Sequence, residues 1–218
     1  MIKDLSYTML YVIVDCGLAS KILHFARVNG VTGGTIIKAH GTVNNRFLRS
    51  LSLDDNKKEI LIMVMRKSMA SIIMPKINEK FKLHKPNRGI AYCIDIEGIC
   101  GSRGCIINEE EKERNDDYMY QSIMVIIEKG KAEEVVEAAV KAGAKGATII
   151  NGRGSGVNET SRVFAMDIEP EKELVLIICK NTIALNIIDR IKVDFKIEEP
   201  GNGLIFVQNV SQVFGLID

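Results

Sequence analysis

The sequence predicts an α+β protein built from two consecutive copies of one βαββαβ unit. Three observations support this prediction: the chain repeats itself, each repeat has the same order of strand-like and helix-like patterns, and the composition suits two small cores. The chain has 218 residues, 46% of them hydrophobic, which is enough for two domains of about 100 residues each. With right-handed crossovers, the order βαββαβ gives a ferredoxin-like sheet that carries both helices on one face.

The internal repeat becomes visible when the chain is shifted against itself by 113 residues. Pairs aligned at this shift are Tyr7 with Tyr120, Gly17 with Gly130 and Thr35 with Thr148. Beyond the first polar loop the shift is 114, and it aligns Pro86 with Pro200, Gly89 with Gly203 and Gly101 with Gly215. A tandem duplication with one insertion in a loop would leave this pattern. We therefore expect domains at residues 1–106 and 118–218, joined by a charged linker at 107–117.

The first half of each repeat predicts a strand and an amphipathic helix. The strands are the β-branched apolar runs at residues 9–14 and 123–127. In the second repeat, apolar residues recur with helical spacing over residues 132–140, and charged residues occupy the other face. Gly30 and Gly143 follow the two helices, at the position where a left-handed C-cap favours glycine.

The middle of each repeat predicts two strands separated by a polar loop. The shorter strand lies at residues 35–38 in the first repeat and 148–151 in the second. The next strand, at residues 60–65 and 174–179, is a nearly unbroken aliphatic run, so we expect both of its faces to be covered.

The end of each repeat predicts a helix, a turn and a last strand. The helices are expected near residues 68–80 and 181–193, and Pro75 should kink or shorten the first of them. A Pro-x-x-Gly turn then precedes strands at residues 90–96 and 204–210. Because two helices cover only one face of such a sheet, oligomerisation is the usual way to cover the other.

Composition and charge exclude several classes of protein. The net charge is +1, from 29 basic and 28 acidic side chains, so there is no electrostatic case for nucleic-acid binding. No stretch approaches the roughly 20 apolar residues that cross a bilayer, so we expect no membrane insertion. Asp4 and the lack of a long apolar run near the start argue against a signal peptide, and we expect a cytoplasmic protein.

The five cysteines and three histidines suggest no catalytic or metal centre. We expect the cysteines to be reduced and to act as small apolar residues. Cys100 and Cys105 are separated by Gly-Ser-Arg-Gly, which is not a usual zinc spacing, and no histidine pair accompanies them. No Ser-His-Asp or Cys-His arrangement would be brought together by the repeats. We therefore expect no metal site and no enzymatic activity.

The most informative stretch for ligand binding is GATIINGRGSG, at residues 146–156. Its alternating glycines would let the backbone approach an anion, and free N–H groups there could form an anion nest. Arg153 would add a charged, bidentate partner for phosphate or carboxylate. The plainer interpretation is a hairpin tip made flexible by glycine. The carboxylates of Asp167, Glu169, Glu171 and Glu173 alternate after this loop, as on a solvated strand edge.

Two separated blocks of the second repeat resemble the nitrogen-regulatory PII signal-transduction family. They are AGAKGATIINGRGSG at residues 142–156 and GNGLIFVQNV at residues 201–210. The first repeat is similar more weakly, through residues 29–37 and 87–96. The resemblance implies a ferredoxin-like trimer that binds adenine nucleotides in clefts between subunits. It also implies a long loop that reports the bound ligand to enzymes, transporters or transcription factors.

The resemblance carries six ligand-binding residues onto this chain. Those matching the Gly-x-Thr beside the adenine are Gly146 and Thr148. Those matching the base of the long loop, near the phosphates, are Gly152, Arg153 and Gly154. The glycine before the last strand, which also borders the nucleotide, is Gly203.

Three departures from the family pattern weaken the expected hold on a triphosphate. Leu204 stands where a lysine usually follows Gly203, the preceding turn is shortened to residues 200–202, and the sequence ends VFGLID without a basic tail. Each missing charge-assisted contact is worth about 1.5–3 kcal/mol. Neither polar loop contains tyrosine, which excludes uridylylation of the usual kind.

The sequence thus favours a PII-like regulatory or sensor protein. It would bind a small anion or an adenine nucleotide (ATP, ADP or AMP) at inter-domain clefts and signal through the polar loop to an enzyme or transporter. A homo-oligomer is expected, with a trimer favoured. One alternative is a ligand-free protein-interaction module. Another is a metal-handling protein like the divalent-cation-tolerance proteins, which share the architecture.

Overall fold

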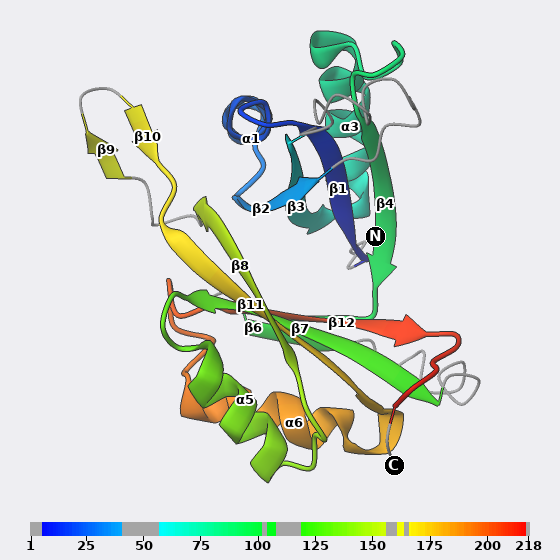
Figure 1. Ribbon diagram of the computed structural model, residues 1–218, viewed down its shortest axis with the longest axis vertical. Helices are drawn as coiled ribbons and strands as arrows, with labels where there is room; N and C mark the ends of the chain where they lie inside the picture. Colours follow the sequence, from blue (N-terminus) through cyan, green and yellow to red (C-terminus); the bar gives the residue numbers. More distant parts are fainter. Residues whose placement is uncertain are drawn as a thin grey trace, which may run out of the picture. The chain divides into compact units, whose positions relative to one another are not determined.

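The computed structural model describes residues 6–40, 57–101, 104–107, 119–155, 161–163 and 166–216 (Figure 1). The chain divides into two units, unit 1 (Met1–Ile94) and unit 2 (Asp95–Asp218). Each unit contains the element order βαββαβ, so the expected tandem ferredoxin-like α+β fold is confirmed. In the part of the chain described, no helix is both long and apolar enough to cross a membrane.

Unit 1 is a four-stranded antiparallel sheet with two helices on one face. Its elements are β1 (Tyr7–Asp15), α1 (Ala19–Val28), β2 (Gly34–His40), β3 (Lys57–Arg66), α3 (Lys67–Phe81) and β4 (Ile90–Ile96). The strands lie in the order β4-β1-β3-β2. Because side chains alternate along a strand, Leu10, Val12 and Val14 all face the helices. There they form one buried core with Ile22 of α1 and Ile73 of α3.

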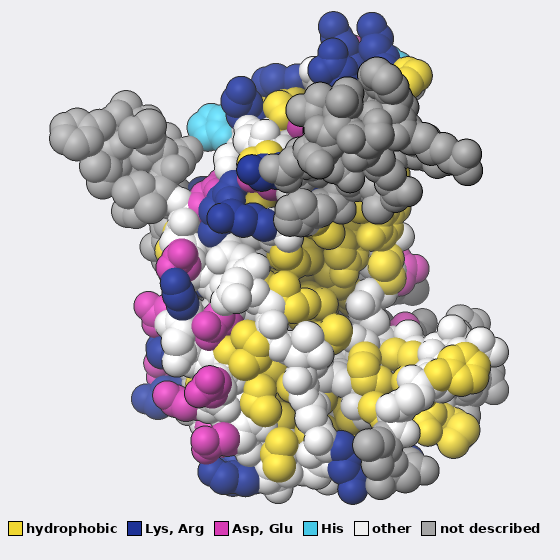
Figure 2. All heavy atoms as spheres, viewed as in Figure 1, with side chains coloured by type: hydrophobic (Ala, Val, Ile, Leu, Met, Phe, Trp, Pro, Cys, Tyr) yellow, Lys and Arg dark blue, Asp and Glu magenta, His cyan; other side chains and the backbone are white. Residues whose placement is uncertain are grey.

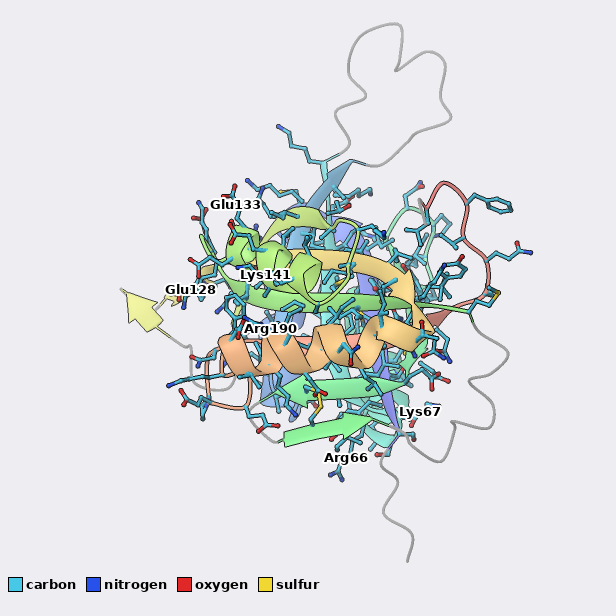
Figure 3. All side chains as sticks on the ribbon, turned by 90° about the horizontal axis from the view of Figure 1, so that it is seen from below. Arg66, Lys67, Glu128, Glu133, Lys141 and Arg190 are labelled. Atoms are coloured by element: carbon cyan, nitrogen blue, oxygen red, sulfur yellow. A yellow bond between two sulfur atoms is a disulfide. The ribbon has the colours of Figure 1, made fainter. Side chains whose placement is uncertain are left out.

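Unit 2 repeats this arrangement and adds strands to it. Its repeated elements are β7 (Tyr120–Glu128), α5 (Ala132–Lys141), β8 (Thr148–Ser155), β11 (Glu171–Lys180), α6 (Asn181–Asp194) and β12 (Leu204–Val210). Helices α5 and α6 lie side by side over one sheet face (Figure 3). The further elements are β5 (Gly98–Gly101), β6 (Gly104–Ile107), β9 (Ser161–Val163) and β10 (Met166–Ile168). The sheet order is β8-β11-β7-β12-β5-β6, and β9 and β10 form a separate two-stranded ribbon.

The division between the units differs from the expected domain boundaries at one segment. Strands β5 and β6, which lie almost wholly within the expected first domain (residues 1–106), extend the sheet of unit 2. Strand β5 pairs with β12, from Ile205 opposite Cys100 to Val207 opposite Gly98. Such a pairing between residues more than a hundred positions apart leaves no local signal in the sequence. Residues 108–118, most of the expected linker, lie outside the described residues.

Most element boundaries agree with the sequence patterns, and one helix differs. The last strands match the predictions at both ends. The expected shortening at Pro75 is wrong, because α3 continues through it to Phe81. Proline removes the hydrogen bond to the carbonyl of Ser71. Both residues are exposed, so water can reach that carbonyl.

The predicted reduced state is wrong for two of the five cysteines. The hairpin register places Cys100 opposite Cys105 on β5 and β6, and a disulfide joins them (Figure 3). Cys16 and Cys93 are exposed and lie outside any disulfide, whereas Cys179 is buried. Burial raises the pKa of the Cys179 thiol to about 11.

Alkylation should therefore distinguish Cys179 from the two exposed cysteines. At pH 8 we expect iodoacetamide to modify Cys16 and Cys93 at least about 100-fold faster than Cys179, because the thiolate is the reactive form. Pulsed labelling followed by mass spectrometry of peptides measures the three rates. In urea all three should react at similar rates, and equally fast labelling of Cys179 without urea would contradict its burial.

Candidate ligand-binding site

The glycine-rich segment of the second repeat is a strand. The expected loop after residue 151 is replaced by a continuation of β8 to Ser155, where Arg153 lies opposite Glu171 of β11. The backbone N–H of Gly154 donates to the carbonyl of Pro170 at 2.9 Å. That N–H already has an acceptor, so the expected anion nest is wrong at this position. Glycine spacing alone did not distinguish a loop from a strand whose partner lies 18 residues away.

The guanidinium of Arg153 is held by a carboxylate from the returning chain. Its Nε lies 2.8 Å from Oε2 of Glu169, and the two side chains are 28% and 12% exposed. An ion pair that is largely shielded from water is only weakly screened. An incoming anion must therefore compete with Glu169 for Arg153.

The predicted adenine-side residues lie at the opposite end of β8. Thr148 is its first residue and Gly146 lies in the segment just before it, and both are exposed. A Cβ on Gly146 would meet no atom within 4 Å. The structure thus separates the Gly-x-Thr residues from Arg153 by most of the length of β8.

Gly203 lies just before β12, which is separated from β8 by two other strands of the sheet. Strands β11 and β7 separate β8 from β12, so Gly203 and Arg153 are about three strand spacings, or about 14 Å, apart. Both lie near the same end of the sheet, because Leu204 pairs with Ile126 and Arg153 with Glu171. A single unit therefore does not bring the six predicted residues into one cluster.

Charged side chains at this end of the sheet are matched in pairs. Lys129 lies 2.5 Å from Glu171, and Lys131 lies 2.9 Å from Glu128. The hydrogen bond from Lys131 lowers the pKa of Glu128, and the hydrogen bond to Glu171 raises the pKa of Lys129. With Arg153 on Glu169, the positive charge in each of these three pairs is matched by a carboxylate.

Glu173, which the sequence suggested was merely solvated, supports the start of helix α5. Its Oε2 accepts hydrogen bonds from the backbone N–H groups of Gly130 at 3.0 Å and Ala132 at 2.9 Å. Glu59 does the same in unit 1, where its Oε2 accepts from Gly17 at 3.0 Å and Ala19 at 3.2 Å. The repeat alignment could have revealed this role, because the two glutamates are equivalent and both precede an aliphatic strand.

A surface depression of about 430 Å³ lies beside α5 and the end of α6 in unit 2. Its charged lining residues are Lys131, Glu134, Glu137, Lys141, Asp194 and Lys196. Lys141 and Glu137 are 3.7 Å apart, and their helix faces solvent (Figure 3). Three lysines and three carboxylates give the depression no preference for an anion. Within the described residues, no cluster of three or more His, Cys, Asp or Glu could hold a metal ion.

A family model matches the second repeat. Residues 120–216 match the model of the family described as Nitrogen regulatory protein P-II. This match runs from β7 to the segment after β12 and confirms the resemblance found in the sequence. No curated protein is significantly similar to the chain.

Several solved structures are similar at low identity. A GlnK–ATP complex from B. subtilis is 19% identical, and the alignment covers 43% of this chain and 83% of the GlnK chain, with a TM-score of 0.35. Arabidopsis thaliana PII bound to citrate is 24% identical, with coverage of 44% and 79% and a TM-score of 0.34. The regulatory subunit of aspartate kinase from Thermus thermophilus is 14% identical, with coverage of 88% and 94% and a TM-score of 0.35.

Proposed function

We propose that the chain is a PII-like regulatory protein rather than an enzyme, because residues 120–216 match the family described as Nitrogen regulatory protein P-II. Unit 2 would bind a small anion or an adenine nucleotide. The ribbon that extends from β8 and β11 would then signal the bound state to an enzyme or transporter. The observation that carries the proposal is the family match over the whole second repeat, which includes all six predicted ligand-binding residues.

The placement of those residues supports a site shared between domains. Arg153 and Gly203 lie on different strands at the same end of the sheet, with two strands between them. One unit alone cannot close both around a small ligand. A cleft between neighbouring domains of a homo-oligomer, with a trimer favoured, would combine the β8 side of one domain with the β12 side of another.

The ion pair at the base of the ribbon suggests how the ligand would act. A phosphate or carboxylate that takes the guanidinium of Arg153 displaces Glu169, which adjoins Pro170. The carbonyl of Pro170 accepts the hydrogen bond from Gly154, so the displacement loosens the connection between β8 and the returning chain. Ligand binding would in this way be coupled to the conformation of the ribbon.

Calorimetry with ATP, ADP, AMP and cyclic AMP tests this site. We expect Arg153→Ala to weaken binding about 10- to 100-fold, as loss of a charge-assisted contact does. We expect Glu169→Gln to tighten binding about 3- to 10-fold, because it removes the competing charge but keeps the shape of the side chain.

A matched control is Arg190→Ala, which removes the same charge from an ion pair on α6 (Figure 3). Arg190 lies 2.6 Å from Asp194, and we expect its loss to leave nucleotide affinity unchanged. The site assignment is wrong if no variant binds any nucleotide, or if wild type and Arg153→Ala bind equally.

The ligand-free interaction module is a second candidate because Arg153 already has a carboxylate partner. In that case the ribbon contacts a protein directly, and nucleotides have no effect on the contact. Pull-down with full-length and ribbon-deleted protein, with and without ATP, separates the two candidates.

Either function would be exerted in the cytoplasm. The Cys100–Cys105 bond would be unusual there, since cytosolic thiols are mostly reduced.

A further inference from the structure

The turn after α3 in unit 1 and the turn after α6 in unit 2 fold alike. Lys82 and Lys196, which the shift of 114 residues makes equivalent, both have positive φ, at 56° and 48°. In unit 1 the backbone N–H of Leu83 donates to the carbonyl of Asn78 at 3.1 Å, and the equivalent residues of unit 2 make the same bond at the same distance. The side chains of the two turns can therefore be compared position by position.

The charges of this segment are balanced in unit 2. Residues 189–203 hold four acidic and three basic side chains, and each basic side chain has a carboxylate partner within the segment. The ion pairs are Arg190 with Asp194 at 2.6 Å, Lys192 with Glu198 at 3.4 Å and Lys196 with Glu199 at 3.6 Å. This backbone is thus compatible with a surface of mixed charge.

In unit 1 the carboxylates of these ion pairs are replaced by basic or titratable side chains. The equivalent positions hold Lys80, His84 and Lys85. Residues 75–89 contain five basic side chains and one carboxylate. Because the turn folds in the same way in both units, packing does not require this positive charge. The basic side chains, which we call the basic turn, are Lys76, Lys80, Lys82, Lys85 and Arg88.

The side chains of the basic turn are exposed, and within the described residues no carboxylate matches them. The ammonium of Lys76 donates to Oδ1 of Asn29 at 3.1 Å. That of Lys80 lies 4.2 Å from the ring centre of Phe25. Neither of these partners carries a negative charge. Figure 2 shows Lys and Arg side chains gathered where Figure 1 places the end of α3 and the turn that follows it.

Exposed aliphatic side chains lie beside the basic turn. Ile72 is 56% exposed, and it precedes Lys76 and Lys80 at a spacing of four residues, which places the three close to one face of α3. Val28 is 74% exposed and adjoins Asn29, the hydrogen-bond partner of Lys76. Basic side chains next to exposed aliphatic ones are typical of surfaces that lie in the headgroup region of a membrane.

We propose that the basic turn docks unit 1 on a membrane surface that contains anionic phospholipids. Headgroup phosphates take the place of the carboxylates that unit 2 has and unit 1 lacks, and the exposed aliphatic side chains enter the headgroup layer. Clusters of four to eight Lys and Arg side chains attract such a surface, and each side chain strengthens binding about fivefold. The contact is peripheral, and it does not rest on the nucleotide site proposed for unit 2.

The chemistry of the turn favours phospholipid over nucleic acid. Proteins that bind single-stranded nucleic acid stack its bases on exposed aromatic side chains. Here Phe25 and Phe81 are half-buried and pack edge to face, with ring centroids 5.8 Å apart, and Lys80 lies over the Phe25 ring. Four of the five cations are lysines, which lack the planar fork that arginine uses on a guanine edge.

Co-sedimentation of the full chain with vesicles tests the proposal. The probes are vesicles with about 30% phosphatidylglycerol in phosphatidylcholine, and vesicles of phosphatidylcholine alone. The test variant combines Lys80→Asp, Lys85→Glu and Arg88→Asn, which are the residues that unit 2 has at these positions, so the turn should still fold. We expect this variant to bind the anionic vesicles at least about 30-fold more weakly than wild type. Wild type should bind the neutral vesicles at least about tenfold more weakly than the anionic ones.

The control variant makes the same change in net charge in unit 2, by Lys141→Asp, Lys145→Glu and Arg190→Asn. At about 0.15 M salt the screening length is about 8 Å, so only charges near the headgroups contribute. The control should therefore bind the anionic vesicles within about threefold of wild type.

A second measurement removes no charge. The chain has no tryptophan, so Ile72→Trp places a single fluorophore beside the basic turn. Its emission should shift to shorter wavelength when anionic vesicles are added, because the ring enters the headgroup layer. Val193→Trp is the control, since Val193 is 71% exposed on α6 of unit 2, and its emission should stay unchanged.

Binding to anionic vesicles that is lost in the unit 1 variant and kept in the unit 2 variant supports the proposal, as does an emission shift confined to Ile72→Trp. Equal binding by the two charge variants, equal binding to neutral vesicles, no binding by wild type, or no shift for Ile72→Trp overturns it. A labelled DNA duplex is a further probe. If wild type binds the duplex but not the anionic vesicles, the basic turn is a nucleic-acid surface and the proposal is wrong. None of these measurements depends on nucleotide binding.

Discussion

Gly203→Ala is expected to destabilise unit 2 by about 3 kcal/mol. Gly203 has φ +147°, a region that side chains with a Cβ rarely adopt, and an added Cβ would lie 2.8 Å from the carbonyl oxygen of Ile126. That oxygen belongs to the backbone of β7 and cannot move without shifting the strand. Because the two units need not unfold together, hydrogen exchange of the β7 and β12 amides is the suitable measurement.

Gly146→Ala is the control, since it changes a glycine of the same predicted site where a Cβ meets no atom within 4 Å. Its stability should stay within about 0.5 kcal/mol of wild type. Gly89 in unit 1 has the same geometry as Gly203, with φ +135° and a Cβ position 2.6 Å from the oxygen of Ile13. Gly89→Ala should therefore be as damaging, and a mild effect at both positions would contradict the close approach.

The comparison of Gly203 with Gly89 matters for function. Both positions require glycine because the turn before the last strand presses against the first strand. This requirement exists in the first repeat as well, where no ligand-binding residue is predicted. The presence of glycine at Gly203 is therefore explained by packing, and a role in binding must be measured separately.

Glu59→Ala is expected to cost about 2–3 kcal/mol of the stability of unit 1. Glu59 is 1% exposed and accepts two backbone hydrogen bonds at the start of α1 through one oxygen. Its other oxygen lies 3.6 Å from Sγ of Cys16. The residue before α1, Leu18, makes no side-chain cap hydrogen bond, so the substitution leaves those N–H groups without their acceptor.

Glu173→Ala should have the same effect on α5 with a smaller magnitude, about 1–2 kcal/mol, because Glu173 is less buried. The control is Glu137→Ala, which removes an exposed carboxylate 3.7 Å from Lys141 and should change stability by less than about 0.5 kcal/mol. Denaturation curves of the three variants, with hydrogen exchange at the two helix starts, provide the comparison. Equal losses for Glu59→Ala and Glu137→Ala would contradict the capping role.

Much of the fold could be predicted because its determinants are local. The apolar run at β12 and the Pro-x-x-Gly turn before it fix the last strand, and Gly143 with φ +108° ends the segment after α5 as expected. The repeat itself gave the element order twice. These patterns depend on residues within a few positions of one another.

The rest could not be predicted because it depends on pairing over long distances. Nothing near Cys100 indicates that its strand joins β12, or that the hairpin brings Cys105 opposite it. The candidate ligand-binding site was harder to predict than the fold. Arg153 looks available in the sequence, and only the return of the chain at Glu169 shows that its charge is already matched.

The pairing of β5 with β12 also has a consequence for synthesis on the ribosome. Ile205, the partner of Cys100, is synthesised about 100 residues later, so β5 has no partner strand until then. At 5–20 residues per second this delay is about 5–20 s, long after unit 1 can fold. During translation the β5–β6 hairpin is thus an exposed nascent segment until β12 has left the ribosome.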